Sequence, residues 1–260
     1  KGANGSIKHI GRLVSGSLSK GEKVETRVDK TLRMDAARNH TATHLLHKAL
    51  KEVLGDHVNQ AGSLVEPDRL RFDITHFEAM TKEEISRVEA MVNEFILEAH
   101  PVTAEVMNIN EARAMGAMAL FGEKYGEEVR VVKMGDCSVE LCGGTHLDNT
   151  SQVGMFKILS EGGVAAGVRR IEAITGRAVY QYILAKDSLI NSISDIMKTR
   201  EDNLVAKANS LVDENKQLEK EAHDLKSKMS MQNAGNALED SLDIKGVKLL
   251  TAKYEDMDMD

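Results

Sequence analysis

The chain has 260 residues, of which 42% are hydrophobic, and its formal net charge is −7. This length allows one or two domains with a hydrophobic core, and the acidic balance argues against a general nucleic-acid-binding protein. Two cysteines are too few for a disulfide scaffold and fit a reducing, cytoplasmic compartment. No run of eighteen apolar residues is present, which excludes a membrane span. Because the sequence begins at Lys1 and stops after Asp260 without a recognisable end, we interpret it as a piece of a longer protein.

Residues 1–39 differ from this acidic average. They carry nine Lys or Arg side chains against four acidic ones, a local excess of five positive charges. Such an excess is sufficient to attract a phosphate backbone locally. From charge alone, we favour the simpler interpretation of a solvated, mildly basic strand surface.

Residues 6–34 contain short apolar groups separated by glycines at positions 11, 16 and 21, which are turn signals between strands. The apolar positions are Ile7, Ile10, Leu13, Val14, Val24, Val28 and Leu32. We therefore interpret residues 1–35 as part of a small β-barrel whose beginning is missing.

Residues 36–175 combine helical and strand patterns. A helix is expected from Ala36 to Leu54, because Gly55 is a stop signal, and a second helix opens at the capping box formed by Thr81 and Glu84. Residues 62–74 predict a hairpin with a Pro67–Asp68 turn. Further strands are expected near 102–107, 129–134, 155–161 and 167–174, with a short helix near 109–116. The sum predicts an α+β domain with a mixed, largely antiparallel sheet.

After Gly176 the strand signals vanish, and a long helical segment is expected over residues 176–238. Leucines recur every seven residues, with mostly small or apolar residues at the alternate seam positions, which is a coiled-coil pattern. The leucines are Leu204, Leu211, Leu218 and Leu225. Both an antiparallel helical hairpin and a long dimeric coil fit this pattern. Residues 239–260 are interpreted as the start of a truncated domain, whose first strand is expected over residues 244–250.

Two matched residue pairs are the most informative feature. His40 is paired with His44, and Cys142 with His146, each with three intervening residues. Imidazole nitrogens and a thiolate are ligands that zinc favours. Residues four apart lie on one face of a helix, and the two glycines after Cys142 allow a sharp turn. The sequence therefore predicts one zinc ion that joins segments about a hundred residues apart.

Two neighbouring residues leave alternatives open. His47 lies on the same helix face as the first histidine pair, so the spacing alone permits any two of the three histidines to be ligands. Cys137 lies only five residues before Cys142. We interpret Cys137 as a small, buried, apolar side chain rather than a ligand.

The number of ligands does not decide the role of the zinc. Four protein ligands are typical of a closed structural site, whereas a catalytic zinc keeps a position for water or substrate. Thr43 adjoins His44, and Gln60 follows an irregular stretch, so either could face the same pocket. A helical Thr that bonds its own backbone and a solvated turn Gln are the simpler interpretations. Arg169 and Arg170 are paired cations suitable for phosphate, although such surface pairs are common.

Four segments stand out when they are assembled: Arg38–His47, Gly116–Tyr125, Glu140–His146 and Gly167–Ala173. Together they resemble the editing region of bacterial alanyl-tRNA synthetases, over essentially the whole chain. The resemblance implies that the aminoacylation part, which uses ATP, the tRNA-recognition part and nearly all of the C-terminal globular domain lie outside this stretch.

The resemblance implies a hydrolytic function. An alanine site cannot fully exclude glycine or serine, so a second site is needed to hydrolyse the ester of Gly-tRNA(Ala) and Ser-tRNA(Ala). In this family a zinc ion would hold the aminoacyl group while water attacks the ester carbon. The matching zinc ligands are His40, His44, Cys142 and His146.

Other site residues are also implied by the resemblance alone. Thr43 matches the position that recognises the serine hydroxyl, and Gln60 matches another editing-pocket position. Arg169, with Arg170 beside it, lies in a motif that we assign to the tRNA end. The helical region implies a possible homo-oligomer.

Three rival readings remain. The editing domain of threonyl-tRNA synthetases shares the two-pair metal motif, and a free-standing alanyl editing protein is also possible. The interior of the second metal pair, the 116–122 segment and the heptads favour the alanyl family. From a different class, the zinc could be structural in a module that binds tRNA and dimerises.

Overall fold

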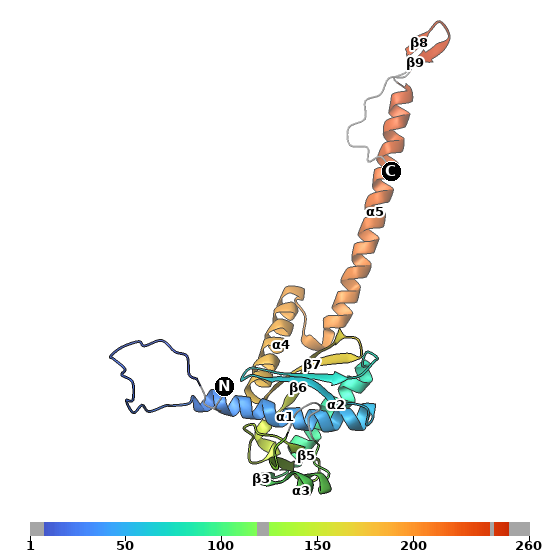
Figure 1. The fold of residues 1–260 in the computed structure, drawn as a ribbon. Helices are drawn as coiled ribbons and strands as arrows, with labels where there is room; N and C mark the ends of the chain where they lie inside the picture. The colour runs from blue at the N-terminus through green and yellow to red at the C-terminus, as the bar shows by residue number, and fades with distance from the viewer. Residues whose placement is uncertain (1–7, 119–124, 240–241, 250–260) are drawn as a thin grey trace. The chain divides into compact units, whose positions relative to one another are not determined.

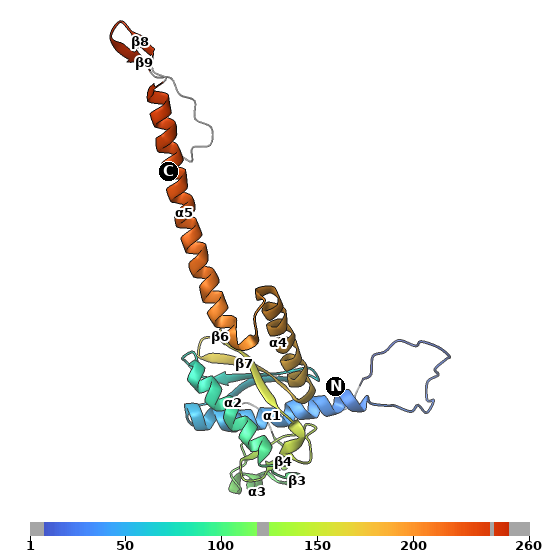
Figure 2. The same cartoon turned by 180° about the vertical axis from the view of Figure 1, so that it is seen from behind.

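A computed structural model describes residues 8–118, 125–239 and 242–249 (Figures 1 and 2). The fold is α+β with antiparallel sheets and a long helix, as predicted. The chain divides into two compact units, Lys1–Gln181 and Tyr182–Asp260. None of the described helices is both long enough and apolar enough to cross a membrane.

Helix α1 (Lys30–Leu54) is the central element of the first unit. Figures 1 and 2 both show it between two sheets, and eleven of its residues are buried. The helix begins six residues before the predicted start at Ala36 because Asp29 caps it: the backbone N–H of Leu32 donates to the Asp29 carboxylate at 3.0 Å. Its end at Gly55 was predicted correctly; there a φ of 112° suits only glycine.

A four-stranded sheet packs on one side of α1. Its strand order is β1-β2-β7-β6, and every neighbouring pair is antiparallel. The strands are β1 (Gln60–Val65), β2 (Leu70–Thr75), β6 (Phe156–Ala165) and β7 (Val168–Thr175). Alternate residues of β2, namely Leu70, Phe72 and Ile74, are fully buried and join the hydrophobic core with α1 and with helix α2 (Lys82–Leu97). The predicted hairpin and the Thr81–Glu84 capping box are both confirmed.

A three-stranded antiparallel sheet lies on the other side of α1 (Figure 1). It consists of β3 (Val102–Asn108), β4 (Glu128–Met134) and β5 (Ser138–Leu141), with helix α3 (Ile109–Ala114) between β3 and β4. A short 3-10 helix, η1 (Thr150–Val153), follows. Strand β5 was not predicted, because four residues are too few to show a clear alternation. Strand β5 contacts α1, and the loop that follows β5 carries Cys142 and His146.

Residues 8–29 contain no helix or strand in the structure. Their apolar side chains are exposed, with Ile10 at 89% and Val14 at 91%. The strands expected at these positions are not observed, and Leu32 belongs to helix α1 rather than to a strand. The domain boundary at residue 35 stays a prediction. Short apolar segments gain little from pairing unless a larger sheet covers them. Ile7 lies outside the described residues, and the partial barrel stays a prediction.

The second unit is mainly helical. Helix α4 (Gly176–Met197) runs into it, and a short 3-10 turn, η2 (Glu201–Asn203), precedes helix α5 (Leu204–Glu239). The helices cover the segment predicted as helical, and the side chains of the heptad leucines Leu218 and Leu225 are 62% and 60% exposed. The packing partner of these leucines, whether a second helix of the same chain or a second copy, stays a prediction.

The end of the described chain is a hairpin of β8 (Leu242–Ile244) and β9 (Val247–Leu249). The prediction of a single strand over residues 244–250 was therefore wrong. Lys245 and Gly246 have φ values of 55° and 85°, which reverse the chain between the two short strands. Leu250 lies outside the described residues.

Candidate metal centre

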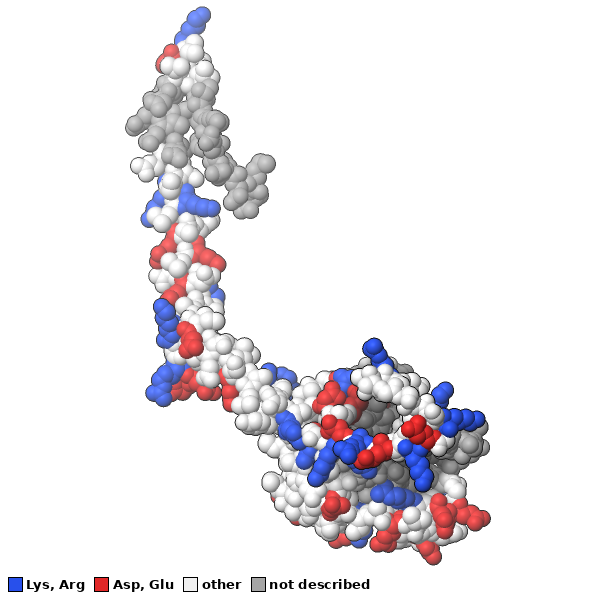
Figure 3. All heavy atoms as spheres, turned by 90° about the vertical axis from the view of Figure 1, so that its left-hand side faces the viewer, with Lys and Arg blue, Asp and Glu red and all other residues white. Residues whose placement is uncertain are grey.

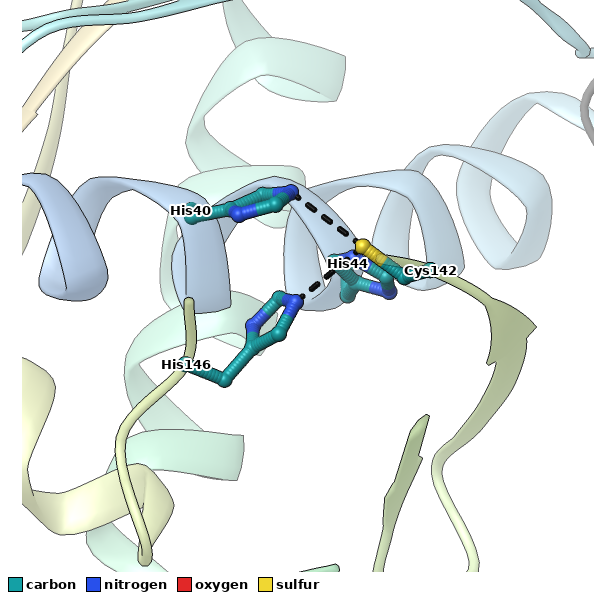
Figure 4. A group of neighbouring side chains, drawn as sticks. All are labelled: His40, His44, Cys142 and His146. Carbon is teal, nitrogen blue, oxygen red and sulfur yellow. Dashed lines mark hydrogen bonds between the residues drawn. The ribbon is translucent and has the colours of Figure 1, made fainter. Parts of the chain in front are cut away.

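The structure brings the two predicted pairs together. His40 and His44 lie one turn apart on α1, and Cys142 and His146 lie in the loop that follows β5 (Figure 4). One potential ligand atom from each of the four lies within 4.8 Å of all the others. This cluster could hold a metal ion.

The distances within the cluster fit a tetrahedral zinc site. The Cys142 sulfur is 3.4 Å from Nε2 of His40 and 3.2 Å from Nε2 of His146. Zinc–sulfur bonds of about 2.3 Å and zinc–nitrogen bonds of about 2.0–2.1 Å at the tetrahedral angle separate sulfur and nitrogen by about 3.5 Å. The side chains therefore need only small shifts to enclose one ion.

The buried carboxylate of Glu140 separates His47 from the cluster. Glu140 lies on β5, with one oxygen 3.1 Å from Nδ1 of His44 and the other 3.4 Å from Nδ1 of His47. The His47 ring instead packs against Phe72, with ring centroids 5.6 Å apart. The carboxylate leaves Nε2 of His44 for the cluster, an arrangement that commonly orients metal-ligating histidines. Of the three histidines, His40 and His44 are therefore the ones that lie in the cluster with Cys142.

The electrostatics of the cluster favour a thiolate. Burial opposes ionisation of Cys142, but the adjacent His146, His40 and His44 lower its pKa to about 3. Burial lowers the pKa of His146 to about 4, so this imidazole is neutral at pH 7. Burial also opposes charge on His44, yet Glu140 and Cys142 raise its pKa to about 10. A thiolate and a neutral imidazole are the forms that bind metal, and a cation at this centre would replace the proton on His44.

Two further side chains hold the ligand loop in place. The guanidinium of Arg130, on β4, donates to the backbone oxygens of Cys142 and Gly144, each at 2.8 Å. The hydroxyl oxygen of Thr41 accepts from the backbone N–H of Leu147 and lies 3.3 Å from Nδ1 of His146. Sequence reasoning missed Arg130, Thr41 and the role of Glu140. Only Glu140 carried a signal, because it lies two residues before Cys142 in an alternating strand.

Gly144 is required by close packing. A Cβ on this residue would overlap the imidazole of His40, whereas a Cβ on Gly143 would meet nothing within 4 Å. The glycine pair was predicted to provide a sharp turn. The structure shows a different need for Gly144, which is room for a ligand from the facing helix.

The other predicted site residues lie in different surroundings. Thr43 is buried, and its hydroxyl donates to the backbone oxygen of His40 at 2.7 Å. Gln60 begins β1 opposite Ile74, and Ile74 is opposite Arg169 on β7, so Gln60 and Arg169 share one row of the sheet. Cys137 is half-buried, donates to the backbone oxygen of Met134 and has its pKa raised to about 11 by burial. It is not part of the cluster.

Arg169 and Arg170 each form a bidentate ion pair with a carboxylate. Arg169 donates to Glu161 at 2.6 and 2.8 Å, and Arg170 donates to Asp73 at 2.7 and 2.8 Å. Adjacent residues of a strand point to opposite faces of a sheet, so the two guanidinium groups cannot grip one phosphate together. A tRNA contact by either residue stays a prediction and would compete with a carboxylate.

Residues 129–172 match a family described as "Threonyl and Alanyl tRNA synthetase second additional domain". The chain is 63% identical to the alanine–tRNA ligase of Clostridioides difficile over 100% of its length, and 54% identical to that of Acetivibrio thermocellus over 99%. The chain belongs to the alanine–tRNA ligase family. It spans 30% and 29% of the lengths of these two relatives.

The matched domain contains only half of the metal cluster. Residues 129–172 include Cys142 and His146, whereas His40 and His44 come from α1, outside the match. Of the segments that carried the resemblance to alanyl-tRNA synthetases, residues 119–124 lie outside the described part of the structure. The family assignment rests instead on identity along the whole chain.

The surface charge of this family member is mixed. Figure 3 shows Lys and Arg side chains interspersed with Asp and Glu on the visible face of the first unit. The ion pairs of this unit include Arg170 with Asp73 and Lys157 with Glu89. Any attraction of this face for a nucleic acid is therefore local rather than general.

The packing of Gly144 gives a matched test of the metal centre. We predict that Gly144→Ala weakens zinc binding by about 10- to 100-fold, the range seen when metal ligands lose their orientation. Gly143→Ala should bind zinc as the unaltered chain does. Competition with a chromophoric chelator measures both affinities. Equal zinc affinity of the two variants would contradict the placement of His40 in the cluster.

Proposed function

We propose that this chain is the editing part of an alanine–tRNA ligase and hydrolyses the ester of Ser-tRNA(Ala) and Gly-tRNA(Ala) in the cytoplasm. The observation that carries the proposal is the cluster of His40, His44, Cys142 and His146. The family match and the similarity to alanine–tRNA ligases support a role in editing. Zinc is the metal that best fits three imidazoles and one thiolate.

Three of the four side chains of the cluster are only partly buried. His44 is buried, but His40, Cys142 and His146 are only partly covered, so a substrate can approach these three side chains. A bound zinc ion would supply a positive charge that orients the aminoacyl group and polarises its ester carbonyl. Partial burial of three ligands favours a functional zinc over a purely structural one.

The residues around the cluster have defined roles in this proposal. Glu140 would keep His44 oriented, since one of its oxygens lies 3.1 Å from Nδ1 of His44. Thr43, next to His44 in the sequence, donates its hydroxyl proton to the backbone oxygen of His40. The hydroxyl oxygen of Thr43 is left to accept a hydrogen bond from a serine hydroxyl, which alanine lacks. Water then attacks the ester carbon, the acyl–oxygen bond breaks, and the terminal ribose oxygen receives a proton.

Hydrolysis of serylated alanine tRNA tests this function. We expect the chain with zinc to cleave Ser-tRNA(Ala) and to cleave serylated threonine tRNA only weakly. Cys142→Ala should lose at least about a hundredfold in rate, equivalent to about 2.7 kcal/mol in the barrier. Cys137→Ala is the matched control and should retain activity, because this thiol lies outside the cluster.

Three results would contradict the proposal or its details. Equal rates of Cys142→Ala and Cys137→Ala would remove the cluster from the reaction. Loss of the native circular dichroism on zinc removal would indicate a structural metal. Faster cleavage of the threonine tRNA substrate would indicate the threonyl-type reading.

A second proposal concerns self-association through α5. The heptad leucines of this helix are exposed, including Leu211 at 41% and Leu218 at 62%. In a coiled coil, such apolar stripes of two helices pack against each other and are thereby buried. We propose that α5 mediates a homo-oligomer.

A charge on the leucine stripe tests this association. Leu218→Lys should raise the dissociation constant by at least about tenfold, equivalent to about 1.4 kcal/mol. Asn209→Lys places the same charge on the opposite side of the helix, since nine residues at 100° each end half a turn away. Sedimentation equilibrium should show weaker association for the first variant only. A monomeric unaltered chain at high concentration would refute the proposal.

A further inference from the structure

A second pair of histidines, His57 and His76, plays no part in the site described so far. Nε2 of His57 lies 2.9 Å from Nδ1 of His76, and the centroids of the two rings are 5.2 Å apart. Because the nitrogens are much closer than the centroids, the nitrogen-bearing edges of the two rings face each other. His57 is exposed and His76 is half-buried, so ions in solution can reach the pair.

The backbone holds both rings in place. The backbone oxygen of His57 accepts from the hydroxyl of Thr75, the residue before His76, at 3.0 Å. The backbone N–H of Asn59 donates to the same hydroxyl oxygen at 3.0 Å, and the backbone N–H of Thr75 donates to the backbone oxygen of Asn59 at 2.9 Å. The backbone N–H of His76 donates to Gly167 at 3.0 Å. Since the backbone under the pair is already fixed, a ligand that binds both rings has little ordering left to cause.

The distance between the two nitrogens suits adjacent ligands of a metal ion with right-angled geometry. Metal–nitrogen bonds of about 2.0–2.1 Å at 90° separate two nitrogens by about 2.8–3.0 Å, whereas the tetrahedral angle separates them by about 3.3–3.4 Å. The observed 2.9 Å between His57 and His76 matches the right-angled arrangement. Square-planar or tetragonal sites with nitrogen ligands are those that Cu²⁺ and Ni²⁺ prefer.

We propose that His57 and His76 form a second metal site, which binds Ni²⁺ or Cu²⁺ through these two facing nitrogens. In the hydrogen bond between the rings, one nitrogen donates and the other accepts. When the ion binds, the donating ring changes tautomer: its proton moves to its other nitrogen, and both facing nitrogens then offer a lone pair to the ion.

Water would complete the coordination of this ion. Within the described part of the chain, the only group of three or more side chains that could hold a metal is the zinc cluster. The proposed site therefore has two protein ligands, and it does not depend on the proposed function. An ion bound there would join the loop after α1, which leads into β1, to the end of β2.

Binding of Ni²⁺–nitrilotriacetate to the zinc-loaded chain tests the site, because this chelate leaves two adjacent positions of the nickel ion open. His57→Ala and His76→Ala should each bind it at least about tenfold more weakly, since the second imidazole no longer adds an intramolecular contact. His223→Ala removes a single exposed histidine of α5 and is the matched control. Isothermal titration calorimetry measures the four affinities, with zinc content checked to be equal.

Two further measurements separate a shared site from binding at one histidine. Electron paramagnetic resonance of the Cu²⁺-loaded chain should show coupling to two imidazole nitrogens, and to only one in His57→Ala or His76→Ala. Ni²⁺–nitrilotriacetate should also raise the thermal unfolding midpoint of the unaltered chain and of His223→Ala, but not of the other two variants, because only a bound ion stabilises the fold.

Three results would overturn the inference. Equal nickel affinity of the unaltered chain and His57→Ala would show that the pair does not bind the ion. An equal loss of affinity in His223→Ala would place the ion elsewhere, as would coupling to a single nitrogen in the unaltered chain. Hydrolysis of Ser-tRNA(Ala) is measured separately, so a failure of this site leaves the proposed function standing.

Discussion

The position of α1 between two sheets is the constraint on which the rest of the first unit depends. Its fully buried residues, such as Leu45, Leu46 and Leu50, fix the helix in the core. Asn39 adds a polar anchor, because its amide donates to the backbone oxygen of Glu66 and accepts from the hydroxyl of Thr175. A helix held in this way fixes the position of His40 relative to the loop after β5. Close packing of α1 therefore orients a metal ligand more precisely than a flexible segment could.

The ligand loop is positioned as firmly as the helix. Arg130 binds two of its backbone oxygens, and Glu140, on the strand that leads into the loop, reaches His44 from the buried side. The two halves of the cluster come from segments about a hundred residues apart, yet each is oriented by its own supporting contacts. The four ligands therefore converge because two rigid elements meet, and a metal ion would complete an arrangement that folding has already built.

Sequence patterns predicted what depends on local spacing. The Thr81–Glu84 capping box, the Pro67–Asp68 hairpin and the two metal pairs each follow from a short motif, and the structure contains the elements that they imply. Contacts between residues far apart in the sequence could not be predicted from such motifs. Nothing in the spacing shows that Thr41 meets His146 or that Arg169 pairs with Glu161, because these partners are set by strand order and register. The prediction of strands within residues 8–29 was wrong for a related reason. A segment with strand-like composition forms a strand only when a partner strand pairs with it.

The central claim is that one ion is bound by three imidazoles and one thiolate from α1 and the β5 loop. X-ray absorption spectroscopy at the zinc edge of the loaded chain tests it most directly. The account predicts one sulfur neighbour at about 2.3 Å and three nitrogen neighbours at about 2.0–2.1 Å. In Cys142→Ala the sulfur neighbour should disappear, and in Cys137→Ala it should remain. A spectrum with no sulfur neighbour, or with two, would contradict the account.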